Sequence, residues 1–207
     1  IGNQLEAEIA VRFIAALNLQ PGDVFLDIGS STGGLCVTAS LTAPASSVVG
    51  VELSPSRYER GRRALESMLS VLPREKPCGD VTFICGDANK PSTNEELRSA
   101  LSRATVVFSA HQLLASFDPV DGGVNEKRIV TSLPWLNYLQ PGTRFVSMAA
   151  VSPDLHTSDS DERRSDDPEG RNLLKLCGAY DMEKAYELTA KEKLRLALEY
   201  EVYSSDG

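Results

Sequence analysis

The chain has 207 residues, of which 42% are hydrophobic and 24% are charged. This length suits one domain with its core under a single sheet, and the composition excludes a mostly disordered chain. No apolar run approaches the roughly 20 residues that a membrane-spanning helix needs. The chain has 21 lysines and arginines against 29 aspartates and glutamates, so its formal net charge is −8. An acidic surface gives no strong reason to bind nucleic acid; it suits a basic partner, or simply keeps the protein in solution.

The cysteines and histidines indicate neither a disulfide framework nor a metal site. The four cysteines are far apart, none forms a C-x-x-C pair, and there are only two histidines. A structural zinc site is therefore not expected, and a reduced, intracellular compartment is the plainest inference. The chain begins at Ile1 rather than methionine, so we expect it to be processed or trimmed, and no signal peptide is visible.

Apolar periodicity predicts alternating helices and strands along the first three quarters of the chain. The expected helices cover residues 3–17, 35–41, 54–72, 92–101 and 124–139. The expected strands cover residues 24–28, 47–53, 81–85, 105–109 and 143–148. Ser92 with Glu95 predicts a capping box at the start of the fourth helix. Because parallel strands need crossover helices, this alternation is typical of a doubly wound, mostly parallel α/β sheet.

The last quarter of the chain departs from this alternation. Residues 153–171 hold seven acidic residues against three arginines, which predicts an exposed, mobile loop; an acidic arm that recruits a basic partner is the alternative. Residues 194–203 alternate apolar and polar side chains, which favours a strand over the helix that their composition also allows. We expect this strand to form an antiparallel hairpin with residues 186–188. The prediction is a single domain over residues 1–207, with a seven-stranded sheet.

The stretch V-F-L-D-I-G-S-S-T-G-G, residues 24–34, is the most informative part of the sequence. An expected strand ends in Asp27, and Gly29 and Gly33 follow before the next helix. Glycine lets the backbone approach a ligand and adopt angles that a side chain forbids, and a helix N-terminus offers free N–H groups. A glycine-rich turn alone is weak evidence, because dinucleotide enzymes share it.

Two further acidic residues make the prediction more specific. Glu52 ends the second expected strand, where a carboxylate can accept hydrogen bonds from both hydroxyls of an adenosine ribose. Asp87 follows the third, where it can accept one from an adenine amino group. Each acid alone could simply cap a turn, but three in register indicate a nucleoside pocket at one edge of the sheet. The missing Walker lysine disfavours a nucleoside triphosphatase, and the absence of G-x-G-x-x-G favours S-adenosylmethionine over a nicotinamide.

These residues carry a family resemblance. D-I-G-S-S-T-G resembles the D-x-G-x-G-x-G of class I, Rossmann-like methyltransferases, with Ser31 at the usual second glycine. More narrowly, the chain is similar to the non-SET histone lysine methyltransferases of the disruptor-of-telomeric-silencing type. That family reads roughly F-V-D-L-G-S-G-V-G-Q, Y-G-V-E, G-D and I-F-V-N-N-F-A-F. The matching segments here are Phe25–Gly34, Val49–Glu52, Gly86-Asp87 and Val107–Phe117, followed by L-Q-P-G-T-R-F-V-S and a similar closing hairpin.

The resemblance implies an S-adenosylmethionine-dependent methyltransferase and a role for ten residues. The methionine end of the cofactor would be held by Asp27, Gly29, Ser30 and Gly33. Its ribose would be held by Glu52 with Leu53, and its adenine by Asp87 with Ala88. Ser109 and His111 would face the methyl acceptor. The implied partner is a basic protein such as a histone, with a nuclear location. An RNA or small-molecule methyltransferase and a non-catalytic cofactor-binding adaptor are the alternatives.

The end of the fourth expected strand departs from the family. The paired asparagines of the family fall near Ser109, Ala110 and His111. A neutral His111 imidazole could accept a proton from an attacking amine or hydroxyl. The alternative is a polar side chain that is satisfied at a strand end. Positioning the nucleophile in line with the sulfonium would supply most of the rate in either case.

Overall fold

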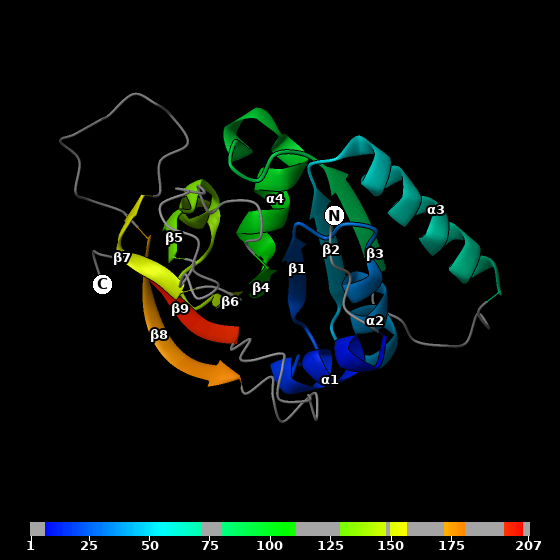
Figure 1. The fold of residues 1–207 in the computed structure, drawn as a ribbon, viewed down its shortest axis with the longest axis horizontal. Coiled ribbons are helices and arrows are strands. Elements are labelled where there is room, and N and C mark those ends of the chain that lie inside the picture. The colour runs from blue at the N-terminus through cyan, green and yellow to red at the C-terminus, as the bar shows by residue number, and fades with distance from the viewer. Residues whose placement is uncertain are drawn as a thin grey trace, which may run out of the picture.

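A mostly parallel β-sheet forms the centre of the protein (Figure 1). The structure is a computed structural model that describes residues 7–71, 80–110, 129–147, 150–156, 172–180 and 197–204. The seven strands of this sheet lie in the order β3 (Asp80–Cys85), β2 (Ser47–Glu52), β1 (Val24–Ile28), β4 (Val106–Ser109), β6 (Arg144–Ser147), β9 (Ala197–Ser204) and β8 (Asn172–Tyr180). Strands β3, β2, β1, β4 and β6 pair in parallel, and β9 pairs antiparallel with β6 and β8. The predicted fold class, a mostly parallel α/β sheet with an antiparallel pair at its C-terminal end, is confirmed.

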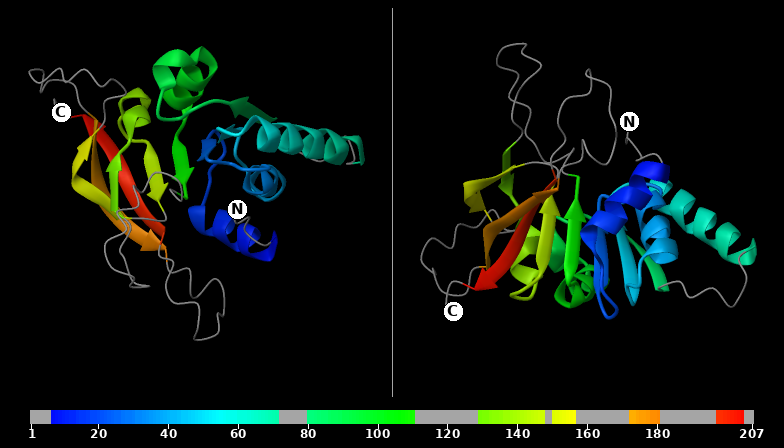
Figure 2. Two further views of the ribbon diagram at one scale, coloured as in Figure 1. Left: turned by 45° about the horizontal axis from the view of Figure 1, so that its top comes forward. Right: turned by 90° about the horizontal axis from the view of Figure 1, so that it is seen from below.

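Helices pack on both faces of the sheet (Figure 2). Helices α1 (Ala7–Leu17) and α2 (Gly34–Thr42) bury Phe13, Ile14 and Cys36 against one face. Helix α4 (Glu95–Arg103) and the 3-10 turn η2 (Pro134–Tyr138) cover the other. Helix α3 (Pro55–Val71) contacts β2 and β3, and a short 3-10 turn, η1 (Pro91–Thr93), precedes α4. None of the described helices is long and apolar enough to cross a bilayer.

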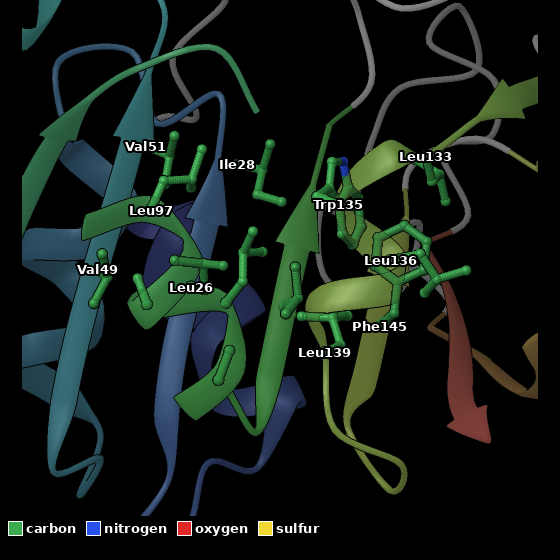
Figure 3. Packing of buried hydrophobic residues seen from close by; sticks show 14 of the residues in the cluster. Leu26, Ile28, Val49, Val51, Leu97, Leu133, Trp135, Leu136, Leu139 and Phe145 are labelled. Atoms are coloured by element: carbon green, nitrogen blue, oxygen red, sulfur yellow. The ribbon is translucent and has the colours of Figure 1, made fainter. Parts of the chain in front are cut away.

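The larger core cluster joins residues that are far apart in sequence (Figure 3). Trp135 of η2 is fully buried, and its ring meets that of Phe145 of β6 edge to face, with centroids 5.1 Å apart. The same cluster includes Leu26 of β1, Leu97 of α4 and Val202 of β9, which are all fully buried. The C-terminal strand is therefore part of the main core.

The helix expected over residues 124–139 is wrong for the part that the structure describes. Residues 129–132 form strand β5 (Ile129–Ser132), which pairs in parallel with β7 (Ala150–His156) in a separate two-stranded sheet. The run Ile-Val-Thr favours extended backbone, because β-branched side chains lose rotamers in a helix. Pro134 disfavours helical angles at Leu133, whose φ and ψ are −138° and 74°.

Three further expectations near element ends change. Asn94, rather than Ser92, caps α4: its side chain accepts a hydrogen bond from the Leu97 N–H at 3.0 Å. The predicted C-terminal strand is found as β9, but the strand that it pairs with is β8, which the sequence did not suggest. The expected partner, residues 186–188, lies outside the described residues. Strand β7 extends to His156, so the expected loop is a strand at its start, and residues 157–171 are not described.

Candidate functional site

The loop between β1 and α2 has a backbone conformation that only a few residue types adopt readily. Gly29, Ser31 and Gly33 all have left-handed φ angles, of 83°, 55° and 77°. The N–H groups of Gly29 and Ser30 both donate to the Val51 carbonyl oxygen, at 2.8 and 2.9 Å. This pair of bonds turns the chain sharply at the end of β1. Nothing lies within 4 Å of where a Gly29 Cβ would stand, so a ligand can approach the backbone there.

Glu52 ties this loop to the one that follows β2. Its carboxylate is buried, with 4% of the residue exposed. One oxygen, Oε2, accepts from the Ser31 N–H at 2.8 Å, and the other, Oε1, accepts from the Ser54 N–H at 2.8 Å. The Arg57 guanidinium lies 3.8 Å from Oε1. Each carboxylate oxygen has two lone pairs, so each can still accept a hydrogen bond from a hydroxyl group.

Asp27 is a second buried carboxylate at the same edge of the sheet, with 4% of the residue exposed. Burial raises its pKa from 3.8 to about 7, the Cys36 thiol that donates to it at 3.7 Å opposes the rise, and the charge of Glu52 adds to it. No cationic side chain in the described part of the chain pairs with Asp27. A cation that bound beside Asp27 would therefore supply a charge that the protein itself does not.

Two residues that the sequence analysis missed, Phe83 and Gly50, pack against the loop between β1 and α2. Phe83 of β3 lies opposite Gly50 of β2, and its ring covers both Gly50 and Gly33. A Cβ added at Gly33 would stand 2.2 Å from the ring, and one at Gly50 would stand 2.6 Å from the ring and 2.9 Å from Ser30 Oγ. The signal was the glycine inside a strand, which often marks a close approach of another group.

The end of β3 carries the residues that were predicted to hold an adenine. Asp87 is half-buried, and its Oδ1 accepts from the Asn89 N–H at 2.9 Å, as a turn-capping carboxylate does. The Gly86 N–H donates to the Glu52 carbonyl oxygen at 3.0 Å, so this turn lies beside the end of β2. Ala88 packs against the larger core cluster, whereas Leu53 is 59% exposed. The adenine-binding role of these residues stays a prediction.

The remaining predicted positions lie at or beyond the end of β4. Ser109 ends that strand, is 2% exposed, and lies in register with Ile28 on one side and Ser147 on the other. Its backbone therefore reaches the same edge as the loop after β1. His111 lies outside the described residues, as does most of the segment that resembles the family's strand-four motif. Their roles toward a methyl acceptor stay predictions.

Four predicted positions thus converge. The parallel register places Ile28 beside Val51 and Ser109, and Glu52 beside Cys85. This brings together the loop at Gly29, the buried Asp27 and Glu52, and the end of β4. Ser30 also lies at this edge, but its Oγ is buried near Gly50 and has no hydrogen-bond partner. Among the described side chains, no group of three or more His, Cys, Asp or Glu could hold a metal ion.

Comparison with known families decides the assignment. The model of a family described as "Histone methylation protein DOT1" matches residues 3–168. The chain belongs to the DOT1 histone methylation family. This confirms the family predicted for the chain from D-I-G-S-S-T-G and V-G-V-E, and with it the methyltransferase class. No curated protein matches this DOT1-family chain in sequence.

Solved structures that resemble the DOT1-family chain are methyltransferases in several cases. An RNA methyltransferase from Salinibacter ruber, in complex with S-adenosyl-L-homocysteine, is 18% identical, with 98% of this chain and 93% of that chain covered and a TM-score of 0.49. A SAM-dependent methyltransferase from Geobacter sulfurreducens, in complex with the same compound, is 22% identical, with 71% and 49% covered and a TM-score of 0.45. The YjhP protein from E. coli is 20% identical, with 71% and 50% covered and a TM-score of 0.45. The chain spans about half the length of the latter two. Because these TM-scores lie below 0.5, the assignment rests on the family match.

Proposed function

We propose that this chain binds S-adenosylmethionine at the edge formed by β1, β2 and β3, and transfers its methyl group to a lysine of a basic protein such as a histone. The observation that carries the proposal is the pair of buried carboxylates, Asp27 and Glu52, on either side of the open backbone at Gly29. The cofactor, when bound, supplies a methyl group on a positively charged sulfur. The family match to residues 3–168 supports a histone as the acceptor.

The residues at this edge fit the cofactor. Asp27 is a buried acid for which the described residues supply no cation, so it suits the amino group of the methionine end. Glu52 keeps acceptor capacity on both oxygens after its two backbone bonds, so it suits the two hydroxyls of a ribose. Gly29 would let the backbone pass close to the methionine part, whereas Gly33 would act by shaping the loop, because the Phe83 ring fills the space beside it. Ala88 with the exposed Leu53 would flank the adenine.

The chemistry needs little more than positioning. A lysine amine that has lost its proton would take the methyl group in line. The nitrogen–carbon bond would form as the carbon–sulfur bond breaks, and the positive charge would pass from the sulfur to the methylated nitrogen. Ser109 lies at the end of β4, where it would face this amine. A pocket that excludes water would favour the step, because the positive charge is spread over the sulfur and the nitrogen in the transition state. The acceptor class implies a nuclear location, which follows only from the proposed substrate.

Calorimetric titration with S-adenosylmethionine and S-adenosylhomocysteine tests the cofactor site. We expect both compounds to bind the native chain, and Glu52→Ala to weaken binding by about 10- to 100-fold, the equivalent of two lost hydrogen bonds. Glu66→Ala is the matched control, because Glu66 is an exposed acid on α3 that pairs with Arg62. A thermal melt of each variant shows that it is folded, which matters because Glu52 also joins two loops. Failure of the native chain to bind would overturn the proposal.

Transfer of a labelled methyl group tests the acceptor. The protein is incubated with labelled cofactor and, separately, with nucleosomes, free histones and RNA, and the product is mapped by mass spectrometry. Label on a histone lysine supports the proposal. Label on RNA only would show that the protein is a methyltransferase with an RNA acceptor in place of a histone. The net charge of −8 makes this outcome unexpected. Cofactor binding without transfer to any acceptor would indicate an adaptor.

A further inference from the structure

The Cys36 thiol lies against the Asp27 carboxylate inside the protein. Cys36 belongs to the first turn of α2 and is 0% exposed, and its Sγ lies 3.7 Å from Oδ2 of Asp27. A carboxylate can only accept, so the thiol is the donor. Among the described residues, no other group donates a hydrogen bond to the Asp27 side chain. The contact joins the helix that follows the glycine loop to the strand that precedes it.

We propose that Cys36 is a positioning residue for the cofactor site: its thiol holds Oδ2 of Asp27 and so orients this carboxylate toward the amino group of the bound cofactor. The inference rests on the proposed function, because it assigns Asp27 to the methionine end. It adds a residue that does not touch the cofactor and acts only through Asp27.

The surroundings of Cys36 explain why it remains a donor. Burial raises the pKa of the thiol well above its usual range, and the neighbouring Asp27 charge raises it further, so the sulfur keeps its proton. The Cys36 side chain packs in the apolar cluster with Leu35 and Ala39 of its own helix and Phe25 of β1. Full burial also keeps the thiol away from oxidants and thiol reagents in solution. Its packing alone could be supplied by valine, so its polar role is separable by mutation.

The groups that act on Asp27 are few. In the sheet its neighbours in register are Gly50 of β2 and Phe108 of β4, and neither titrates. The described titratable groups that influence it are Cys36 of α2 and Glu52 of β2. Cys36 favours the charged form of Asp27, and Glu52 disfavours it. Loss of the thiol therefore favours the protonated form, which cannot attract an ammonium group.

Two Cys36 variants test the inference. Cys36→Val keeps apolar volume and removes the donor, whereas Cys36→Ser keeps a donor. The dissociation constant of S-adenosylhomocysteine is measured calorimetrically from pH 5.5 to 9 for the native chain and both variants. We expect Cys36→Val to weaken binding about 3- to 10-fold at pH 7 and to move the pH of half-maximal affinity upward. Cys36→Ser should follow the native profile more closely than Cys36→Val does. A Cys36→Val profile that superimposes on the native one overturns the inference.

A second measurement separates this inference from the proposed function. The titration of the Asp27 carboxyl carbon is followed by NMR without cofactor, in the native chain and in Cys36→Val. An upward shift of its midpoint in the variant supports the contact, and an unchanged midpoint overturns it, whether or not the cofactor binds. Absence of cofactor binding by the native chain at every pH overturns the proposed function instead, and with it the positioning role.

Discussion

Ser31 has a left-handed backbone at a position where the related motif has glycine. Its φ angle is 55°, and its N–H donates to Glu52 at 2.8 Å. A residue with a Cβ loses about 1 kcal/mol in this conformation relative to glycine. The hydrogen bond from its backbone N–H to a buried carboxylate holds the loop in this shape, and glycine would make the same bond.

We therefore expect Ser31→Gly to raise the free energy of unfolding by up to about 1 kcal/mol, because it removes the strain and keeps the backbone N–H. Urea unfolding of the native chain and the variant measures the difference. Gly29→Ala, at φ 83°, is the matched opposite and should lower stability by about 1–2 kcal/mol. Equal stability of all three chains would contradict the left-handed geometry of this loop.

Asp27 makes the stability of the cofactor-free protein depend on pH. Burial raises its pKa from 3.8 to about 7, so between these values the folded state binds a proton that the unfolded state has lost. The stability of the fold is therefore highest below about pH 4, as far as this group is concerned, and falls until about pH 7. The loss is of the order of 4 kcal/mol at most.

Asp27→Asn tests this dependence, because asparagine resembles the protonated acid in shape and carries no charge. Relative to the native chain, the variant should gain stability as the pH rises from about 4 to 7 and stay constant above that range. Urea unfolding at pH 4, 5, 6, 7 and 8 measures the difference. A difference that does not change with pH would show that Asp27 titrates normally.

At the scale of elements, the pairing of β2 with β3 supports the glycine loop. Phe83 of β3 fills the space above Gly50 of β2 and reaches Gly33 at the start of α2. The Phe83 ring thus joins the glycine loop to the sheet by packing contacts. Glycine at both positions is required by contact, and at Gly33 also by its φ of 77°.

Gly50→Ala should lower the free energy of unfolding by about 1–3 kcal/mol, because the new methyl group would meet the Phe83 ring. In a Phe83→Ala background the same change should be much less harmful, and a double-mutant cycle measures this coupling. Gly34→Ala is the control: nothing lies within 4 Å of its added Cβ, so it should be neutral or slightly stabilising. Additive effects of Gly50→Ala and Phe83→Ala would mean that the ring does not cover the glycine.

At the scale of the whole molecule, β9 joins the C-terminal part of the chain to the main sheet. It lies between β6 and β8 and pairs with both. Val202 of this strand is fully buried in the larger core cluster, and its N–H and C=O bond to the turn before β6. Removing β9 would leave unpaired backbone on two strands and open the core.

A chain truncated after residue 196 should therefore lose cooperative unfolding and most of its near-ultraviolet circular dichroism, to which Trp135 contributes. A chain truncated after residue 204, which keeps β9, is the control and should unfold like the native chain. Urea unfolding followed by circular dichroism compares the two. An unchanged unfolding midpoint in the shorter chain would show that the sheet is stable without β9.

Elements and site residues with local signals could be predicted from the amino-acid sequence. The alternating apolar segments predicted a parallel sheet whose strands are connected by helices. The glycines after Asp27 and the acid at Glu52 predicted that two carboxylates meet at one edge of this sheet. These features follow from chirality and from the side-chain periods of strands and helices, which short segments carry on their own.

Features that depend on distant partners could not be predicted and are seen only in the folded chain. The segment of β5 satisfies a helical spacing but pairs with β7, and β9 pairs with β8, which no sequence pattern indicated. The contacts of Cys36 with Asp27 and of Phe83 with Gly50 likewise join elements whose side chains meet only after packing. Such pairings are set by which surfaces are buried together, and no local pattern encodes them.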